Sequence, residues 1–288
     1  MTFVSIDGVR VAPEDATISV FDRGFLYGDG AFEVLRTWNG RAVEMPRHLD
    51  RLFETLDALS LRADRELVAS PGSAGARSNA DALRRMIERS VAEGLVERSE
   101  SVIRIVVTRG PGGLARRIRD IDGGRTIVII EAMGAQPTTA SVATVEFPLA
   151  RRAGRGHKTL AYLDHVIARE LARDAGADEA IRLDPDGNVI EAATSNVFAV
   201  IDGTVVTPPV DTGALPGIVR RRVLELHPVR VRTLSRRELV DADEVFLTSS
   251  IKGVIAVNRL DNEPRGVGPV TTRIAEAYVA CMRDPSTI

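Results

Sequence analysis

Side-chain amines are scarce in this sequence. Among its 288 residues, lysine occurs only at Lys158 and Lys252, so 36 of the 38 basic residues are arginine. A primary amine can act as a nucleophile toward a carbonyl carbon, provided that burial or a neighbouring cation lowers its pKa. A surface lysine is usually a solvated charge, but arginine would fill that role here equally well. Chemistry that requires a side-chain amine therefore has two candidates.

Other patterns that could carry chemistry are incomplete. The four histidines do not have the H-x-x-x-H spacing of zinc ligands, and Cys281 is the only cysteine. Gly24, Gly28 and Gly30 could be mistaken for a dinucleotide fingerprint, but no parallel βαβ unit surrounds them. The glycine-rich run 109–113 lacks the Lys-Ser/Thr of a P-loop. We therefore expect no metal site and no disulfide framework.

The overall composition is that of a soluble globular protein. Hydrophobic residues make up 44% of the chain and charged residues 27%, and the net charge is −2. A nearly neutral chain without basic runs is not typical of a dedicated nucleic-acid-binding protein. No apolar run reaches the roughly 18 residues of a membrane-spanning helix, and the N-terminus has no signal-peptide pattern. The sequence predicts a cytoplasmic protein without nucleic-acid or membrane partners.

Hairpins and helices must position the candidate residues. Four Asx-Gly dipeptides between short β-rich runs predict hairpins, because these residues tolerate positive φ. They are Asp7-Gly8, Asn39-Gly40, Asp186-Gly187 and Asp202-Gly203. Apolar residues at three- and four-residue spacing predict helices after Pro46, from Leu160 to Leu171 and after Pro216, and Ser235–Glu238 has the spacing of a capping box. Such a mixture, without a βαβ rhythm, predicts an α+β fold.

A change in composition predicts a domain boundary. The run 132–140, AMGAQPTTA, follows a predicted strand and consists mainly of small residues with a proline. We therefore expect a small α+β N-terminal domain over 1–132, a connection over 133–140 and a larger C-terminal domain over 141–288.

Three groups of segments carry a family resemblance. The first group is FDRGFLYGDGAFEVLR (21–36) and MPRHLDRLF (45–53). The second is GHKTLAYLDHVIAREL (156–171), ADEAI (177–181) and GNVIEAATSNVF (187–198), and the third is GALPGIVR (213–220) and DEVFLTSS (243–250). In order and spacing they resemble the class IV aminotransferases, the fold-type IV enzymes that use pyridoxal 5′-phosphate. The resemblance implies a two-domain α+β fold of the D-amino acid aminotransferase-like type, and this cofactor.

The resemblance assigns cofactor roles to three residues. Lys158 matches the lysine that forms a Schiff base with the cofactor, which leaves Lys252 as a possible pocket residue. Glu191 matches the acidic partner of the pyridine nitrogen, where a carboxylate keeps that nitrogen protonated. Arg51 matches the phosphate-binding arginine, which could bind bidentately.

Further cofactor contacts are implied around these three. The backbone amides of Ile218 and Val219 match positions that bind the phosphate, since free N–H groups at a helix start suit a dianion. Tyr162, one helical turn after Lys158, is placed either to bond the cofactor's phenolic oxygen or simply to pack. Hydroxyl groups are expected from Thr194, Ser195, Thr248 and Ser250.

The substrate side of the site is less sharply marked. A substrate carboxylate calls for arginine or tyrosine, and the candidates are Tyr27, Arg104 and Arg109. Phe32 stands where Bacillus-type D-amino acid transaminases have a tyrosine that binds the carboxylate. Because the chain has 36 arginines, an arginine near the site says little about which residue binds the substrate carboxylate.

These assignments imply a transaminase that interconverts an amino acid and a 2-oxo acid, with Lys158 moving the α-proton. The stretches FEVLRTWNG (32–40) and KTL…SNVF (158–198) are most similar to the D-amino acid branch, so the resemblance favours a D-amino acid donor with an atypical carboxylate pocket. The alternatives are an aminodeoxychorismate lyase, which eliminates pyruvate, and a branched-chain L-amino acid aminotransferase. An intact Lys158, Glu191 and Arg51 argue against a non-catalytic binding protein. The resemblance also implies a homodimer, with residues from 23–33 or 104–116 reaching the other subunit's cofactor.

Overall fold

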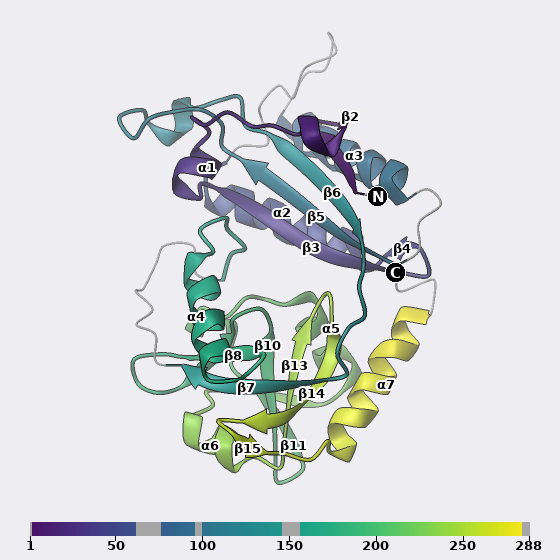
Figure 1. Cartoon of the computed structure of the whole chain (residues 1–288), viewed down its shortest axis with the longest axis vertical. Coiled ribbons are helices and arrows are strands. Elements are labelled where there is room, and N and C mark those ends of the chain that lie inside the picture. Colours follow the sequence, from purple (N-terminus) through teal and green to yellow (C-terminus); the bar gives the residue numbers. More distant parts are fainter. Residues whose placement is uncertain (1, 62–75, 96–99, 146–155, 284–288) are drawn as a thin grey trace. The chain divides into compact units, whose positions relative to one another are not determined.

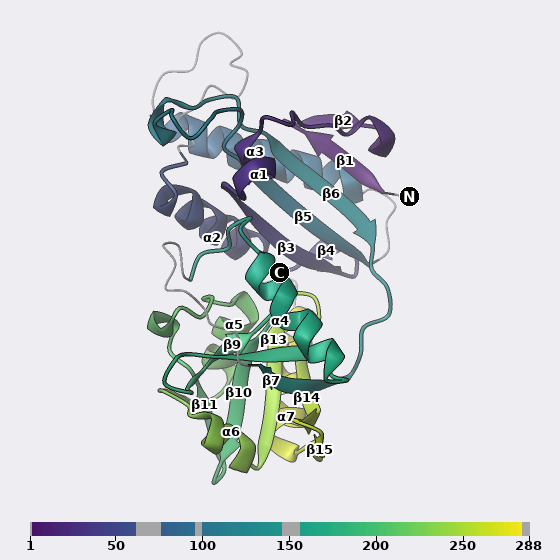
Figure 2. The same cartoon turned by 60° about the vertical axis from the view of Figure 1, so that its left-hand side comes forward.

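Two compact units make up the chain. The computed structural model describes residues 2–61, 76–95, 100–145 and 156–283. One unit takes residues 1–134 and 157–161, and the other takes 135–156 and 162–287. Each unit combines a β-sheet with helices, so the predicted α+β class is confirmed (Figures 1 and 2). A domain connection at 133–140 stays a prediction.

The first unit is built on a six-stranded antiparallel sheet of order β2-β1-β6-β5-β3-β4. Its strands are β1 (Phe3–Ile6), β2 (Val9–Val11), β3 (Gly30–Trp38), β4 (Arg41–Ala42), β5 (Ser101–Thr108) and β6 (Thr126–Ala132). The predicted hairpins at Asp7-Gly8 and Asn39-Gly40 are confirmed, and all four residues have positive φ. This conformation matches the right-handed twist of the flanking strands.

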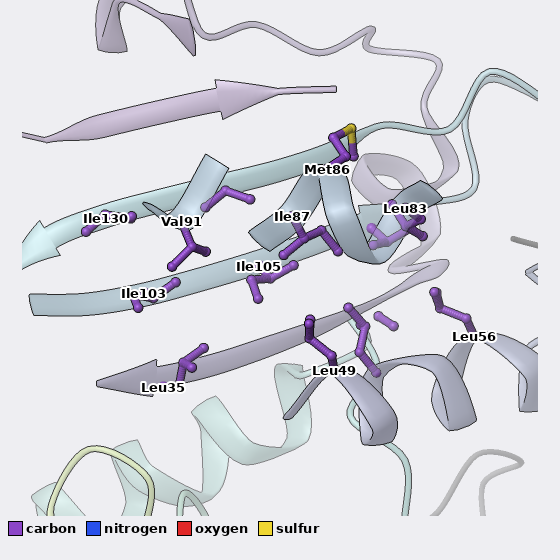
Figure 3. Packing of buried hydrophobic residues seen from close by; sticks show 14 of the residues in the cluster. Leu35, Leu49, Leu56, Leu83, Met86, Ile87, Val91, Ile103, Ile105 and Ile130 are labelled. Atoms are coloured by element: carbon purple, nitrogen blue, oxygen red, sulfur yellow. The ribbon is translucent and has the colours of Figure 1, made fainter. Parts of the chain in front are cut away.

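Two helices cover one face of this sheet. Helix α2 (Met45–Ala58) packs on β3, and α3 (Ala76–Leu95) packs on β1, β5 and β6. Figure 3 shows the buried side chains between the layers, which come from both the strands and the helices. They include Leu35, Ile103, Ile105, Leu49 and Ile87, all fully buried. This apolar layer holds α2 rigidly against β3.

Strand register decides which candidate residues share a face. Glu33 pairs with Ile105, and Val34 pairs with Arg104, across β3 and β5. Because side chains alternate along a strand, Glu33 lies on the helix-covered face with Ile105. Phe32 and Arg104 lie on the opposite face. The short helix α1 (Arg23–Tyr27) precedes β3.

The second unit is built on a nine-stranded mixed sheet of order β12-β11-β10-β13-β14-β7-β8-β9, with β15 paired to β14. Its strands are β7 (Thr139–Val145), β8 (Glu179–Leu183), β9 (Val189–Ala192), β10 (Asn196–Ile201), β11 (Thr204–Thr207), β12 (Val229–Val231), β13 (Glu244–Ser249), β14 (Gly253–Leu260) and β15 (Glu263–Pro264). The predicted turns at Asp186-Gly187 and Asp202-Gly203 are confirmed, between β8 and β9 and between β10 and β11.

The helices of the second unit are α4 (Leu163–Asp174), α5 (Ile218–Leu226), α6 (Arg236–Asp241) and α7 (Pro269–Arg283). The predicted capping box is confirmed, since the Ser235 side chain accepts from the Glu238 amide and the Ser235 amide donates to the Glu238 carboxylate at 2.9 Å. Helix α4 begins at Leu163 and not at Leu160 as the apolar spacing predicted. The Leu160 amide instead donates to the Gly30 carbonyl at 2.9 Å. None of the helices in the described part of the chain is long and apolar enough to span a membrane.

Candidate active site

Lys158 lies in the first unit, in a short extended segment paired with the start of β3. The Phe32 amide donates to the Lys158 carbonyl at 3.0 Å, and this pairing places Lys158 Nζ 4.4 Å from the centroid of the buried Phe32 ring. The close approach requires glycine at position 30. A Cβ on Gly30 would lie 2.4 Å from the Val107 carbonyl oxygen and 2.6 Å from a Leu160 methyl carbon. The glycine that begins β3 therefore allows close packing against the backbone of β5 and against the Leu160 side chain of the lysine segment.

A buried ionic cluster lies on the helix-covered face of the same unit. Arg51 Nε donates to Glu33 Oε1 at 2.7 Å, and Arg51 Nη2 donates to Oε2 at 2.8 Å. His48 Nδ1 is 2.7 Å from Glu33 Oε2. His48 and Arg51 are three residues apart on α2, so both side chains point from one helix face toward β3.

The electrostatics of this cluster define its protonation states. Burial would raise the pKa of Glu33, but the charge of Arg51 and the hydrogen bonds from His48 and Arg51 outweigh burial and hold that pKa at about 2. Burial lowers the pKa of His48, and the charges of Arg51 and Lys158 act in the same direction, against Glu33. A neutral His48 therefore donates its Nδ1 proton to Glu33, because an ionised carboxylate can only accept.

Sequence reasoning missed Glu33 and His48 as site residues. The available signal was a glutamate at an inward position of an apolar strand, together with a His-x-x-Arg pair on one helix face. Arg51 was predicted to bind phosphate, and here it holds Glu33 with a bidentate pair. A guanidinium carries five N–H donors, so this pair does not preclude a phosphate contact. The phosphate role of Arg51 stays a prediction.

Arg109 is buried and connects separate segments of the first unit through hydrogen bonds. Its Nε donates to both oxygens of Asp29 at 2.7 and 2.8 Å. Its Nη1 and Nη2 donate to the carbonyls of Ser60 and Leu59, at the end of α2, at 3.1 and 2.8 Å. These contacts tie α2 to the chain just before β3 and give Arg109 a structural task.

The other substrate candidates of the first unit are more accessible. Arg104 is exposed on β5, with its Cζ 5.9 Å from the centroid of the Phe32 ring. Tyr27, at the end of α1, is also exposed, and its ring lies 5.0 Å from Arg23 Cζ. The structure thus brings Arg104 and Lys158 to the same aromatic ring.

Glu191 lies in the second unit, on β9, and is almost fully buried. Its Oε2 accepts from the Leu215 amide at 2.9 Å, and its Oε1 is 3.5 Å from Arg182 Nη1. Arg182 is the residue directly opposite Glu191 across β8 and β9. No local pattern pointed to Arg182, because the contact depends on strand register.

Tyr162 lies just before α4 in the same unit as Glu191. Its hydroxyl donates to the Ala193 carbonyl at 3.1 Å, and His165 Nδ1 lies 2.8 Å from the same oxygen. The Tyr162 and His165 rings are stacked, with centroids 4.2 Å apart and planes 2° from parallel. Tyr162 therefore packs on His165, and its contact with the cofactor stays a prediction.

The start of α5 has the features of an anion site. Ser195 Oγ and Thr248 Oγ1 are buried and have no hydrogen-bond partner among the described residues. Asn196 pairs with Thr248 across β10 and β13, and its Nδ2 donates to the Leu215 carbonyl at 2.9 Å. A Cβ on Gly217, the N-cap of α5, would lie 1.9 Å from Asn196 Oδ1, so this approach requires glycine. A phosphate at this helix start would satisfy its free N–H groups, and the two orphaned hydroxyls are candidate further donors.

The remaining predicted residues of the second unit occupy varied positions. Ile218 and Val219 are the first two residues of α5. Thr194 donates its hydroxyl to the buried Glu179. Ser250 lies half-buried in the turn after β13, and its cofactor role, like that of Thr194, stays a prediction. Hydrogen bonds from Ser141 lower the pKa of Asp178, and the charge of Lys252 acts in the same direction.

These features define a class of enzyme. A lysine amine, a buried carboxylate and orphaned hydroxyls at a helix start are the partners that the carbonyl, ring nitrogen and phosphate of pyridoxal 5′-phosphate require. The chain belongs to the class IV aminotransferase family, since the family model described as "Amino-transferase class IV" matches residues 30–260. The predicted family and fold-type IV architecture are confirmed, and the enzyme depends on pyridoxal phosphate.

Known relatives cover almost the whole chain. A putative branched-chain-amino-acid aminotransferase of Methanocaldococcus jannaschii is 31% identical over 96% of this chain and 94% of the relative. A D-alanine aminotransferase of Staphylococcus aureus is 27% identical over 96% of this chain and 97% of the relative. The solved branched-chain amino acid aminotransferase of Escherichia coli is 25% identical. It superposes with a TM-score of 0.81 over 96% of this chain and 93% of that one.

Proposed function

We propose that the protein is a branched-chain L-amino acid aminotransferase, which passes the amino group of a donor such as leucine to a 2-oxo acid. The observation that carries this choice is the buried Phe32 ring, 4.4 Å from Lys158 Nζ and 5.9 Å from Arg104 Cζ. An aromatic ring beside the reactive amine offers contact area to an aliphatic side chain and no hydroxyl to a carboxylate. Branched-chain names also predominate among the similar proteins.

A D-amino acid transaminase is the second candidate. The sequence favoured it, and relatives named D-alanine aminotransferase support it. The geometry of Arg109 weighs against it, because this arginine of the T-R-G run is committed to Asp29 and to the end of α2. Arg104 is the better candidate to bind the substrate carboxylate, since it is exposed on the face that carries Phe32.

Lys158 Nζ is the atom that removes the proton from the substrate's α-carbon in this proposal. Bound pyridoxal phosphate draws electrons from that carbon and makes its proton acidic. The amine must be neutral to accept the proton, and Phe32 shields it from water on one side. The Glu33–His48–Arg51 cluster holds together β3 and α2, the elements that carry Phe32 and Arg51.

Further residues are proposed to hold the cofactor. Glu191 would hold the proton of the ring nitrogen, since its carboxylate is buried and fixed by the Leu215 amide. The amides of Ile218 and Val219 would bind the phosphate, with hydroxyl donors at Ser195, Thr248 and Ser250 and a guanidinium at Arg51. Tyr162, whose hydroxyl donates to the Ala193 carbonyl, would contact the cofactor's phenolic oxygen.

We further propose that a second copy of this chain covers an apolar surface of the first unit. Phe21, Phe25 and Leu114 are 70%, 65% and 73% exposed. Their segments lie side by side, since the Gly112 amide donates to the Phe21 carbonyl at 3.3 Å. Grouped exposed aromatic and aliphatic side chains are typical of protein interfaces. Sedimentation should show a dimer that Phe25→Asp dissociates, whereas Val9→Asp, equally exposed on β2, should leave it intact. A fully active dilute monomer would contradict this.

Absorption spectroscopy of the purified holoenzyme tests the substrate assignment. L-leucine should remove the visible band of the bound cofactor, and 2-oxoglutarate should restore it, whereas D-alanine should leave the band unchanged. Loss of the band with D-alanine alone would favour the second candidate. If neither amino acid acts and aminodeoxychorismate yields pyruvate, the protein is a lyase.

The two lysines provide a matched pair of variants. Lys158→Ala should abolish the lysine-dependent band and lower the transamination rate by at least about 100-fold, because it removes the general acid/base. Lys252→Ala removes the other amine of the chain and should keep both band and rate. Equal losses in the two variants would exclude Lys158 as the reactive amine.

A further inference from the structure

A buried arginine, Arg182, lies next to Glu191 and has no role in the proposed reaction. Arg182 is 7% exposed and stands on β8 directly opposite Glu191 on β9. Its Nη1 lies 3.5 Å from Glu191 Oε1, while the Leu215 amide donates to Oε2 at 2.9 Å. Each carboxylate oxygen thus faces a separate donor of the protein. Two donors on different elements restrict rotation of the carboxylate about its last bond.

His165 contacts the same guanidinium. Arg182 Nη1 lies 2.9 Å from His165 Nδ1 and 3.0 Å from Nε2. If Nη1 lay in the plane of the ring at these distances from both nitrogens, it would overlap the ring carbons. Arg182 Nη1 therefore lies over the face of the imidazole. Nδ1 is also 2.8 Å from the Ala193 carbonyl oxygen, which can only accept, so Nδ1 carries the proton. The stacked Tyr162 ring fixes the plane of the imidazole.

The guanidinium has an electrostatic consequence for Glu191. A buried carboxylate that has no cation nearby is neutralised by taking up a proton. A neutral carboxyl group would no longer attract a protonated ring nitrogen. A guanidinium next to Glu191 Oε1 stabilises the ionised form and so opposes this loss.

We propose that Arg182, supported by His165, is a positioning residue that keeps Glu191 ionised and oriented toward the pyridine nitrogen of the cofactor. The contacts form a continuous series from Tyr162 through His165 and Arg182 to Glu191, all within the second unit. This inference rests on the cofactor role proposed for Glu191.

Cofactor affinity of the cofactor-free enzyme tests the inference without recourse to activity. Pyridoxal phosphate is titrated into wild type, Arg182→Met, Glu191→Gln and the double variant, and the dissociation constant is read from the quenching of protein fluorescence. Arg182→Met should raise the dissociation constant about tenfold, by analogy with outer partners of metal ligands. In the Glu191→Gln background, the same change should have less than about a twofold effect, because Arg182 acts through the carboxylate.

The outcomes distinguish a failure of the role proposed for Arg182 from a failure of the role proposed for Glu191. Equal effects of Arg182→Met in both backgrounds would show a merely structural role and overturn the inference, while leaving the role of Glu191 intact. If Glu191→Gln itself leaves the dissociation constant unchanged, the proposed role of Glu191 fails and the inference fails with it.

Three further variants control for folding. Arg182→Lys keeps the charge and should recover most of the affinity. His165→Phe keeps an aromatic face against Arg182 but loses the bond to Ala193, and it should weaken binding less than Arg182→Met does. Arg265→Met removes another arginine of this unit, whose donors go to the carbonyls of Val240 and Ala242, and it should leave the dissociation constant unchanged. If Arg182→Met does not fold, unchanged binding in His165→Phe and a loss in Arg265→Met would still refute the inference.

Discussion

Each of the two units buries a carboxylate next to an arginine, but the two carboxylates are held in different ways. In the first unit, Glu33 accepts two short hydrogen bonds from Arg51 and is 2.7 Å from His48. In the second unit, Glu191 Oε2 accepts from the Leu215 amide at 2.9 Å, and Glu191 Oε1 lies 3.5 Å from Arg182 Nη1. Glu33 is therefore held by two side chains of α2, whereas the contacts of Glu191 are a backbone amide and an arginine on the neighbouring strand.

This difference separates a carboxylate that holds a fold from one that serves a ligand. Three charge-assisted contacts satisfy Glu33 and lock β3 to α2, so it has little capacity for another partner. A carboxylate offers about four lone-pair positions, so the contacts of Glu191 with Leu215 and Arg182 do not preclude a cofactor contact. The first is therefore expected to dominate stability, and the second to dominate cofactor binding.

Neutralising each carboxylate gives the largest predicted difference. Glu33→Gln leaves Arg51 buried without its anion and should lower the free energy of unfolding of the cofactor-free protein by about 3–5 kcal/mol. Glu191→Gln breaks a longer contact and should cost about 1–2 kcal/mol. Urea denaturation, followed by circular dichroism, measures both. Equal losses would mean that the two clusters are energetically alike and would remove the distinction drawn here.

Acid should separate the wild-type protein from Glu33→Gln. The pKa of Glu33 is about 2 in the folded protein, below its ordinary value of 4.5. The folded state therefore binds this proton more weakly than the unfolded chain does. Stability from Glu33 is fully present above pH 4.5 and is lost as the pH falls toward 2, by about 3 kcal/mol in total.

The measurement is the urea midpoint of both proteins at about pH 5.5 and about pH 3. The wild-type midpoint should fall more than that of Glu33→Gln, since the variant has no carboxyl group to protonate at this position. Other carboxyl groups titrate equally in both proteins and cancel in the difference. Parallel falls in the two proteins would show that Glu33 is not ionised against Arg51 in the folded state.

The same contrast explains which residues the sequence could reveal. Lys158 and Glu191 were predicted because each stands in a local motif, and because lysine is rare in this chain. The Glu33 cluster was not predicted, since His48 and Arg51 reach Glu33 only when α2 packs on β3. Arg109 is a predicted substrate arginine, and its contacts with Asp29 and the end of α2 are with residues 49 to 80 positions away in the sequence.

Local pattern also failed where a distant strand competed for the backbone. The apolar spacing from Leu160 onward predicted a helix, but the Leu160 amide bonds to Gly30, and α4 starts only at Leu163. Helical propensity is a weak preference that tertiary pairing overrides. The predicted α+β class is correct despite the misplaced helix start, because it depends on the mixture of helices and strands and not on their exact ends.

Glu179 extends the comparison to a carboxylate with neutral donors, where we expect an effect no larger than that of Glu191→Gln. It is fully buried, and it accepts from the Thr194 hydroxyl and from the Ala180 amide at 3.2 Å. Thr194→Val keeps the shape of the side chain but leaves the carboxylate without that donor, which should cost about 1–2 kcal/mol of unfolding free energy. Thr194→Ser keeps the hydroxyl and should cost less. Because Thr194 was also predicted to contact the cofactor, both variants should be titrated with pyridoxal phosphate. A loss of cofactor affinity in Thr194→Val without a loss of stability would mean that the hydroxyl serves the cofactor and not Glu179.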